Sequence, residues 1–169
     1  MGVNCSARAV GALQGLMLRS LCDLRSLFLS VTKYDTTAAK IQSFLGAVGT
    51  IVHLELDGAT TSVMSALQAV DILPRLKNLE IRDFCQHSLD SEWDDYYGLE
   101  YGSLVEMLRW RQENDAPLES FDLFLYTSRG SFVRAPPAKL ITAFRDLGEA
   151  GLHVRVTHER GVFLDTHQV

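Results

Sequence analysis

The densest group of potential metal ligands in the chain is the stretch FCQHSLDSEWDD. It carries one thiol, one imidazole and four carboxylates, on Cys85, His87, Asp90, Glu92, Asp94 and Asp95. Zinc sites use paired cysteines and histidines at short fixed spacings, and calcium loops place their oxygen ligands in a set order. The stretch follows neither pattern, so we predict a solvated acidic loop and no metal site.

Catalytic motifs are not legible elsewhere. The sequence has no phosphate-binding glycine loop, no GxSxG elbow and no HExxH pair. Cys85 and His87 stand two residues apart, but no neighbouring side chain would orient the imidazole as a base. His153 precedes a core-facing strand residue, and we interpret it as a surface histidine. The expectation is therefore a protein that is not an enzyme and uses no cofactor.

The amino terminus carries a possible lipidation signal. Residues MGVNCS fit the pattern in which Gly2 is myristoylated, and Cys5 offers a second acylation site. Two acyl chains anchor a protein stably, whereas one does not. Because the pattern is short and loose, we expect membrane association only if Gly2 is acylated.

Composition and charge narrow the class of protein. The chain of 169 residues, 47% hydrophobic and 22% charged, has the composition of one globular domain. A net charge of −5 argues against nucleic-acid binding. No apolar run approaches the roughly 20 residues of a membrane helix. The three scattered cysteines favour a reducing compartment, so we predict a cytoplasmic or nuclear protein.

A recurring apolar spacing indicates the elements that position these residues. In LPRLKNLEI the apolar residues stand three, three and two apart, and LCDLRSLFL and VGTIVHLEL repeat that spacing, while LESFDLFL and GLHVRV follow it in part. A final pair two residues apart is typical of a short strand with one buried face. We predict that the pairs on three of these strands are buried: Leu54 and Leu56, Leu79 and Ile81, Phe121 and Leu123. The second residues of the five pairs are Leu29, Leu56, Ile81, Leu123 and Val154.

Amphipathic segments lie between the predicted strands. Their apolar positions cluster at 38–45, 63–70, 104–108 and 140–147, the last after the Pro136-Pro137 pair, and a further helix is expected over 7–19. Trp110 is an additional core candidate on the third segment. Alternating strands and helices imply right-handed crossovers and a parallel sheet.

The repeat length points to a fold class. The first two steps between the second residues of the pairs are 27 and 25 residues, within the ~20–29 residue range of leucine-rich repeats. We predict one α/β, leucine-rich-repeat-like domain over 1–169, with a parallel sheet and helices on one side. The asparagine expected after each repeat strand is missing. A doubly wound α/β domain is the alternative, because its buried strands would also be apolar.

An acidic aromatic insertion at about 83–100 lengthens the third step to 42 residues. Residues 83–108 hold seven acidic residues and no lysine or arginine. The candidate partner-binding residues are Trp93, Asp94, Asp95, Tyr96 and Tyr97. Long loops often bind partners, and aromatic side chains often anchor interfaces. The alternative is that Trp93 and one tyrosine pack back onto the helices.

Residues between the buried pairs face the other side of the sheet. In successive strands they are Phe28, Glu55, Glu80, Asp122 and His153. Neighbouring parallel strands lie ~4.8 Å apart, so Glu55, Glu80 and Asp122 would form a column of carboxylates. Such a column would attract a cation or a basic protein face. The alternative is that Arg82 and solvent compensate the charge.

The stretches LPRLKNLEI, LESFDLFL and FRDLGEAGLHVRV resemble the C-terminal repeat regions of F-box proteins from basidiomycete fungi. The resemblance runs from about Leu21 to Leu164 and rests on leucine spacing, and the chain shows no F-box helix. It implies a protein-interaction module, the substrate-recognition part of an F-box-type ubiquitin ligase receptor. The expected partner is a protein with a basic face.

The competing functional hypothesis is a small α/β enzyme. Its site would lie at the C-terminal ends of the strands, where Asp57, Asp83 and the loop over 126–130 are the candidate residues. The order of the strands separates the two hypotheses, because only a doubly wound sheet reverses that order.

Overall fold

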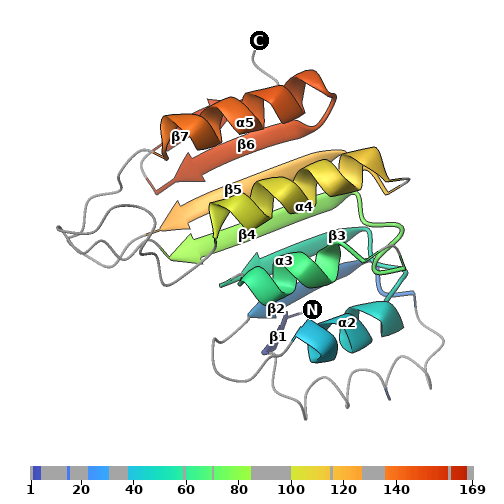
Figure 1. Cartoon of the computed structure of the whole chain (residues 1–169). Coiled ribbons are helices and arrows are strands. Elements are labelled where there is room, and N and C mark those ends of the chain that lie inside the picture. The colour runs from blue at the N-terminus through green and yellow to red at the C-terminus, as the bar shows by residue number, and fades with distance from the viewer. Residues whose placement is uncertain are drawn as a thin grey trace.

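The protein has two layers, a sheet and a set of helices packed on one of its faces (Figure 1). The structure, a computed structural model, describes residues 2–4, 15, 23–30, 38–58, 60–69, 71–84, 100–114, 116–126, 136–159 and 161–166. The described strands are β1 (Gly2–Asn4), β2 (Ser26–Ser30), β3 (His53–Asp57), β4 (Asn78–Phe84), β5 (Ser120–Tyr126), β6 (His153–His158) and β7 (Gly161–Asp165). The described helices are α2 (Ala38–Ala47), α3 (Thr61–Leu67), α4 (Tyr101–Glu113) and α5 (Ala138–Glu149).

The strands lie side by side in chain order from β1 to β7, and β1 to β6 are parallel. A doubly wound sheet places later strands on both sides of the first and has helices on both faces. In the described ranges the order does not reverse, and the helices lie on one face (Figure 1). The protein is therefore an α/β fold with a mostly parallel sheet, and the doubly wound alternative is wrong for these strands.

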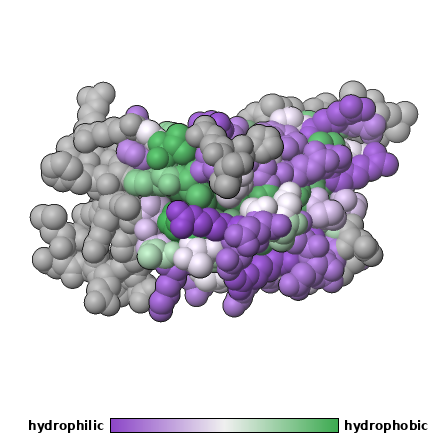
Figure 2. Space-filling model, turned by 90° about the horizontal axis from the view of Figure 1, so that it is seen from above, coloured by the Kyte–Doolittle hydropathy of each residue, from purple (hydrophilic) through white to green (hydrophobic). Residues whose placement is uncertain are grey.

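The sheet ends in an antiparallel strand that the sequence did not predict. Only residues 159 and 160 connect β6 to β7, which is enough for a hairpin but too short for a parallel crossover. Figure 2 looks onto the edge formed by β6, β7 and α5, where hydrophilic residues cover more of the coloured surface than hydrophobic ones. Val162 on β7, 59% exposed, is the large apolar side chain most open to solvent in the described part.

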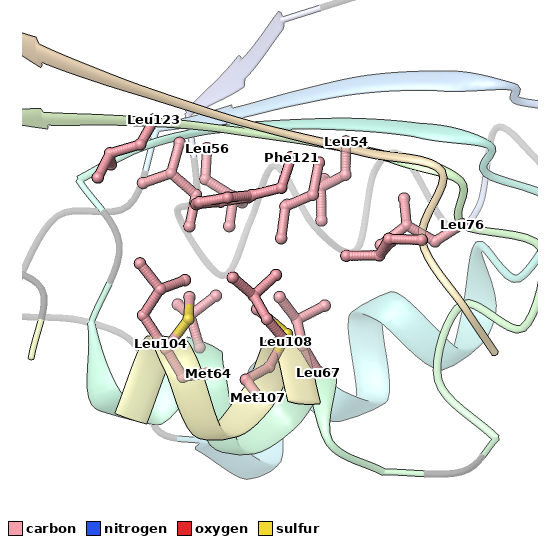
Figure 3. Close-up of a cluster of buried hydrophobic side chains, with 14 of the residues drawn as sticks. Leu54, Leu56, Met64, Leu67, Leu76, Leu104, Met107, Leu108, Phe121 and Leu123 are labelled. Carbon is pink, nitrogen blue, oxygen red and sulfur yellow. The ribbon is translucent and has the colours of Figure 1, made fainter. Parts of the chain in front are cut away.

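The core lies between the inner face of the sheet and the helices. All six strand residues predicted to be buried are 0–1% exposed. In Figure 3, Leu54, Leu56, Phe121 and Leu123 project from the sheet toward Met64 and Leu67 of α3 and toward Leu104, Met107 and Leu108 of α4. The predicted pairs thus make the core, as their alternation requires.

The buried residues form rows across the sheet. Leu29, Leu56, Ile81 and Leu123 pair in one row, and Val156 continues that row. Val154, the second residue of its apolar pair in the sequence, lies in the neighbouring row and pairs with Phe121. Both valines are buried, since a slip of two residues keeps a side chain on the same face.

A buried arginine takes the core position at which Trp110 was considered. Arg111 follows Leu104 and Leu108 on the inner stripe of α4 and is fully buried, whereas Trp110 is only half-buried. The Arg111 guanidinium donates to the carbonyl oxygens of Leu67 at 3.0 Å, Leu73 at 2.7 Å and Ala116 at 3.4 Å. Burial lowers the pKa of Arg111 to about 10, so the group remains a cation at neutral pH.

Arg111 supports an unusual turn before β4. Leu73 has a φ of +51°, a left-handed conformation that costs a residue with a side chain on the order of 1 kcal/mol. Its carbonyl oxygen is the acceptor of the shortest Arg111 hydrogen bond, and its own side chain is fully buried. The turn is therefore stabilised by the burial of the Leu73 side chain and by the hydrogen bond from the Arg111 guanidinium.

Near the amino terminus, the structure describes one strand and little else. The helix expected over 7–19 lies outside the described residues, apart from Gly15, which is helical. Gly2 begins β1, a strand that the sequence did not predict, and pairs with Phe28. No helix within the described ranges has the length and apolar character needed to cross a membrane.

Candidate interaction face

The sheet has an outer face, defined here as the side of β2 to β7 opposite the helices. On β2 to β6, strand alternation places a polar or aromatic residue there at every second position, and most of these residues are partly exposed. Because the strands are in register, the residues form straight rows across the sheet. The central row is Phe28, Glu55, Glu80, Asp122 and Arg155.

The central row contains the predicted carboxylate column. Glu55 on β3 pairs with Glu80 on β4, and Glu80 pairs with Asp122 on β5. On β6, Arg155 lies opposite Asp122, while His153, which the sequence also places on this face, lies opposite Ser120. The column is thus followed by a cation instead of a histidine.

Arg82 lies across the first two carboxylates of the column. Its Nη2 is 2.8 Å from Glu55 Oε1, and its Nε is 3.0 Å from Glu80 Oε1. The pKa of Arg82 is raised, mainly by its hydrogen bond to Glu80, with a smaller contribution from the charge of Glu55. One guanidinium therefore neutralises part of the charge on two neighbouring strands.

Arg155 pairs with the third carboxylate. Its Nε donates to Asp122 Oδ1 from the adjacent strand. In the free protein, Arg82 and Arg155 therefore compensate the negative charge of the column's carboxylates. Both arginine side chains are about half exposed, at 47% for Arg82 and 51% for Arg155, so these pairs are accessible from solvent.

Three outer-face residues also lie close enough to act as metal ligands. One ligand atom from each of His53, Glu55 and Glu80 lies within 4.8 Å of the other two. His53 and Glu55 are alternate residues of β3, and Glu80 is opposite Glu55, which explains the cluster. The guanidinium of Arg82 already bonds to both glutamates, so a metal ion would have to displace it. The sequence did not single out this trio.

A second polar group lies at the C-terminal ends of β2, β3 and β5. Tyr126 donates its hydroxyl hydrogen to Asp57 Oδ1 at 2.9 Å, and Ser30 donates to Asp57 Oδ2 at 3.4 Å. Partial burial, followed by the bond to Asp57, raises the pKa of Tyr126 to about 12. The phenol is therefore a hydrogen-bond donor near neutral pH and a poor nucleophile or base.

The candidate enzyme residues are only partly brought together. Asp57 lies on the outer face, but Asp83 follows Arg82 on β4, points to the helix side and is 2% exposed. Asp83 belongs to β4 and is not part of a loop, so the strand continues one residue beyond the predicted start of the insertion. Residues 127–130 of the candidate loop lie outside the described part.

Aromatic side chains on β5 are a feature that the sequence did not single out as a binding element. The rings of Phe124 and Tyr126 are stacked, with centroids 6.4 Å apart and planes 23° apart. They are alternate residues of one strand and share the outer face with Asp122. A period-two pattern of Asp122, Phe124 and Tyr126 was the available signal, because all three must face the same side.

Most of the predicted insertion residues fall outside the described ranges. This applies to Trp93, Asp94, Asp95, Tyr96 and Tyr97, to the ligand-rich stretch 85–95, and to Cys5. His153, interpreted as a surface histidine, is half-buried, and its Nε2 lies 3.1 Å from Asp165 Oδ1 on β7.

The face as a whole presents charged groups beside the two stacked rings of Phe124 and Tyr126. Five acidic side chains, Glu55, Asp57, Glu80, Asp122 and Asp165, face outward with the two arginines. Such a surface can contact a partner by ion pairing around an aromatic anchor. Comparisons of the chain with family models, with curated proteins and with solved structures found no match.

Proposed function

We propose that the chain is a protein-interaction module that contacts its partner with the outer face of the sheet. The observation that carries this proposal is the one-sided architecture. The helices cover one face, and the other bears in-register charged residues and the Phe124–Tyr126 stack. Many protein interfaces have aromatic anchor residues surrounded by charged or polar residues.

The proposal includes a leucine-rich-repeat-like origin for the sheet. Sequential strand order, helices on one side and rows of leucine across β2, β3 and β4 support it. Repeat proteins of this kind bind partners on the open face of their sheet.

We further propose that the bound partner is a substrate of an F-box-type ubiquitin ligase, and that the protein acts in the cytoplasm or nucleus. The resemblance of LPRLKNLEI and its related stretches to such receptors supports this role. Catalysis is not part of the proposal. Strand order without a reversal offers no switch-point crevice in the described sheet, and the Tyr126 hydroxyl, hydrogen-bonded to Asp57, keeps its proton near neutral pH.

Site-specific photo-crosslinking in cells of the native host tests the interaction face. A photoreactive residue replaces Phe124 on the outer face in one variant and Glu106, an exposed residue of α4, in the matched control. We expect a partner crosslinked from position 124 and not from position 106. Crosslinks obtained only from position 106 would place the interface on the helices and refute the proposal.

The ligase role is tested on the partner captured in that way. Depletion of the protein should lengthen the partner's half-life and reduce its ubiquitin conjugates. A partner whose half-life and ubiquitin conjugates do not change would leave a binding module but contradict the ligase role.

A further inference from the structure

We propose that Arg82 is an internal occupant of the partner-binding site, which an arginine of the partner displaces. This inference rests on the proposed function, because it concerns the same outer face. It assigns a specificity role to a residue of the chain and a chemistry to the partner: a segment that carries an exposed guanidinium.

The geometry around Arg82 shows what the site accepts. Two nitrogen atoms on one edge of the guanidinium meet one oxygen atom each of Glu55 and Glu80, at 2.8 and 3.0 Å. The two carboxylates stand on adjacent strands, so their spacing is set by the sheet. A planar fork matches such a spacing, whereas a lysine ammonium is a compact point charge. The site is therefore shaped for arginine.

The charge around the site favours a cationic partner even though Arg82 is present. Asp57 on β3 lies directly opposite Arg82 on β4, and its negative charge contributes to the raised pKa of Arg82. Glu55, Glu80 and Asp57 together carry three negative charges against the single charge of Arg82. An arginine from a partner would thus meet a net negative surface.

Moving the Arg82 guanidinium away from Glu55 and Glu80 costs little free energy. The Arg82 side chain is 47% exposed, and exposed ion pairs contribute little to stability because water and salt compensate their loss. The guanidinium can therefore swing into solvent while the strand stays paired. A partner arginine that takes its place would also gain contacts with Phe124, which pairs with Arg82 on the next strand and is half-buried.

A substitution at Arg82 gives a result opposite to that of an ordinary contact residue. Arg82→Gln removes the internal competitor and should bind a labelled hexa-arginine peptide roughly three- to fivefold more tightly than the unaltered protein, about 0.65–1 kcal/mol. Fluorescence anisotropy at low and at physiological salt provides the measurement. The gain should be smaller with hexa-lysine, because the ammonium does not span both carboxylates.

Matched variants separate this effect from net charge. Arg109→Gln removes one positive charge from α4, where Arg109 lies 3.9 Å from Asp146, and should change the affinity less than about twofold. Arg82→Lys keeps the charge but not the fork, and it should give a smaller gain than Arg82→Gln. Adding Glu80→Gln to Arg82→Gln should cancel the gain. Thermal melting checks that each variant is folded.

Three outcomes would overturn the role of Arg82. Arg82→Gln could bind hexa-arginine no more tightly than Arg109→Gln, the gain could persist with Glu80→Gln, or the variant could gain affinity for Zn²⁺ alone, which would assign His53, Glu55 and Glu80 to a metal. If crosslinks from position 124 persist in such a case, the interaction face stands and only the role of Arg82 fails. If those crosslinks are absent, the proposed function fails as well.

Discussion

On β4, Leu79 and Ile81 are buried against helix side chains, while Glu80 and Arg82, each one residue further along, form ion pairs on the outer face. Burying a leucine contributes about 1.5–3 kcal/mol, whereas an exposed ion pair contributes about 0–1 kcal/mol. The two faces of the strand therefore differ in their contribution to stability. The inner face stabilises the fold, whereas the side chains of the outer face can be exchanged with little loss of stability.

The largest expected effect comes from the inner face. Leu79→Ala should reduce the free energy of unfolding by ~2–5 kcal/mol, because it removes a fully packed side chain and leaves a cavity between sheet and helices. Asn78→Ala, the neighbouring residue on the outer face, is the matched control and loses one hydrogen bond with Ser120. Urea denaturation measures both, and equal losses would contradict the division between the faces.

Arg111 is an ionic side chain, like those of the outer face, but it is buried on the inner side of the sheet. Arg111→Ala should cost ~2–4 kcal/mol, since the carbonyl oxygens of Leu67 and Leu73 lose their donors in a place that water does not reach. Arg111→Met, which restores volume without hydrogen bonds, should recover only part of the loss. Full recovery in denaturation experiments would mean that packing alone matters at this position.

Close packing at the edge of the helix layer predicts a smaller effect. A Cβ on Gly148 would lie 2.6 Å from Cγ2 of Thr166, whose Oγ1 accepts a hydrogen bond from the Val154 amide. Gly148→Ala should therefore destabilise the protein by ~1–3 kcal/mol, despite the better helix propensity of alanine. Thr166→Ser removes the clashing methyl group, and the double variant should melt at a higher temperature than Gly148→Ala alone.

The smallest effect belongs to the outer face. Arg82→Gln should change the free energy of unfolding by less than ~1 kcal/mol, and that small change should shrink further at high salt. Denaturation at two salt concentrations checks this expectation. A loss as large as that of Leu79→Ala would show that the ion pairs hold the sheet together and would remove the contrast between the faces.

The sequence predicted most of the inner face because alternation and leucine spacing report burial directly. Leu54, Leu79 and Phe121 followed from that rule and are buried. Alternation could not fix the register of β6, because a shift of two residues leaves every side chain on the same face. The sequence therefore did not indicate which residue of β6 lies opposite Asp122, whereas it aligned Glu55, Glu80 and Asp122 correctly.

Other features depend on contacts between distant residues. Arg111 has the position of a core residue but not the residue type, so a rule based on hydrophobicity passes over it in favour of Trp110. Its acceptors Leu67 and Leu73 come from an earlier part of the chain, and no local pattern indicates them. Arg82 was recognised as a possible counter-ion to the column, but its bridging of two strands required the geometry.

The buried hydrogen bonds of Arg111 also bear on how the protein folds and unfolds. Arrays of strand–helix units often open from one end, because each unit contacts only its neighbours. Arg111 at the end of α4 is bonded to the last turn of α3, to the bend before β4 and, more weakly, to the segment before β5. Release of any one of these segments would leave a buried cation short of acceptors. The middle of the molecule should consequently open as a single cooperative unit, with the outer strands exchanging their amide hydrogens first.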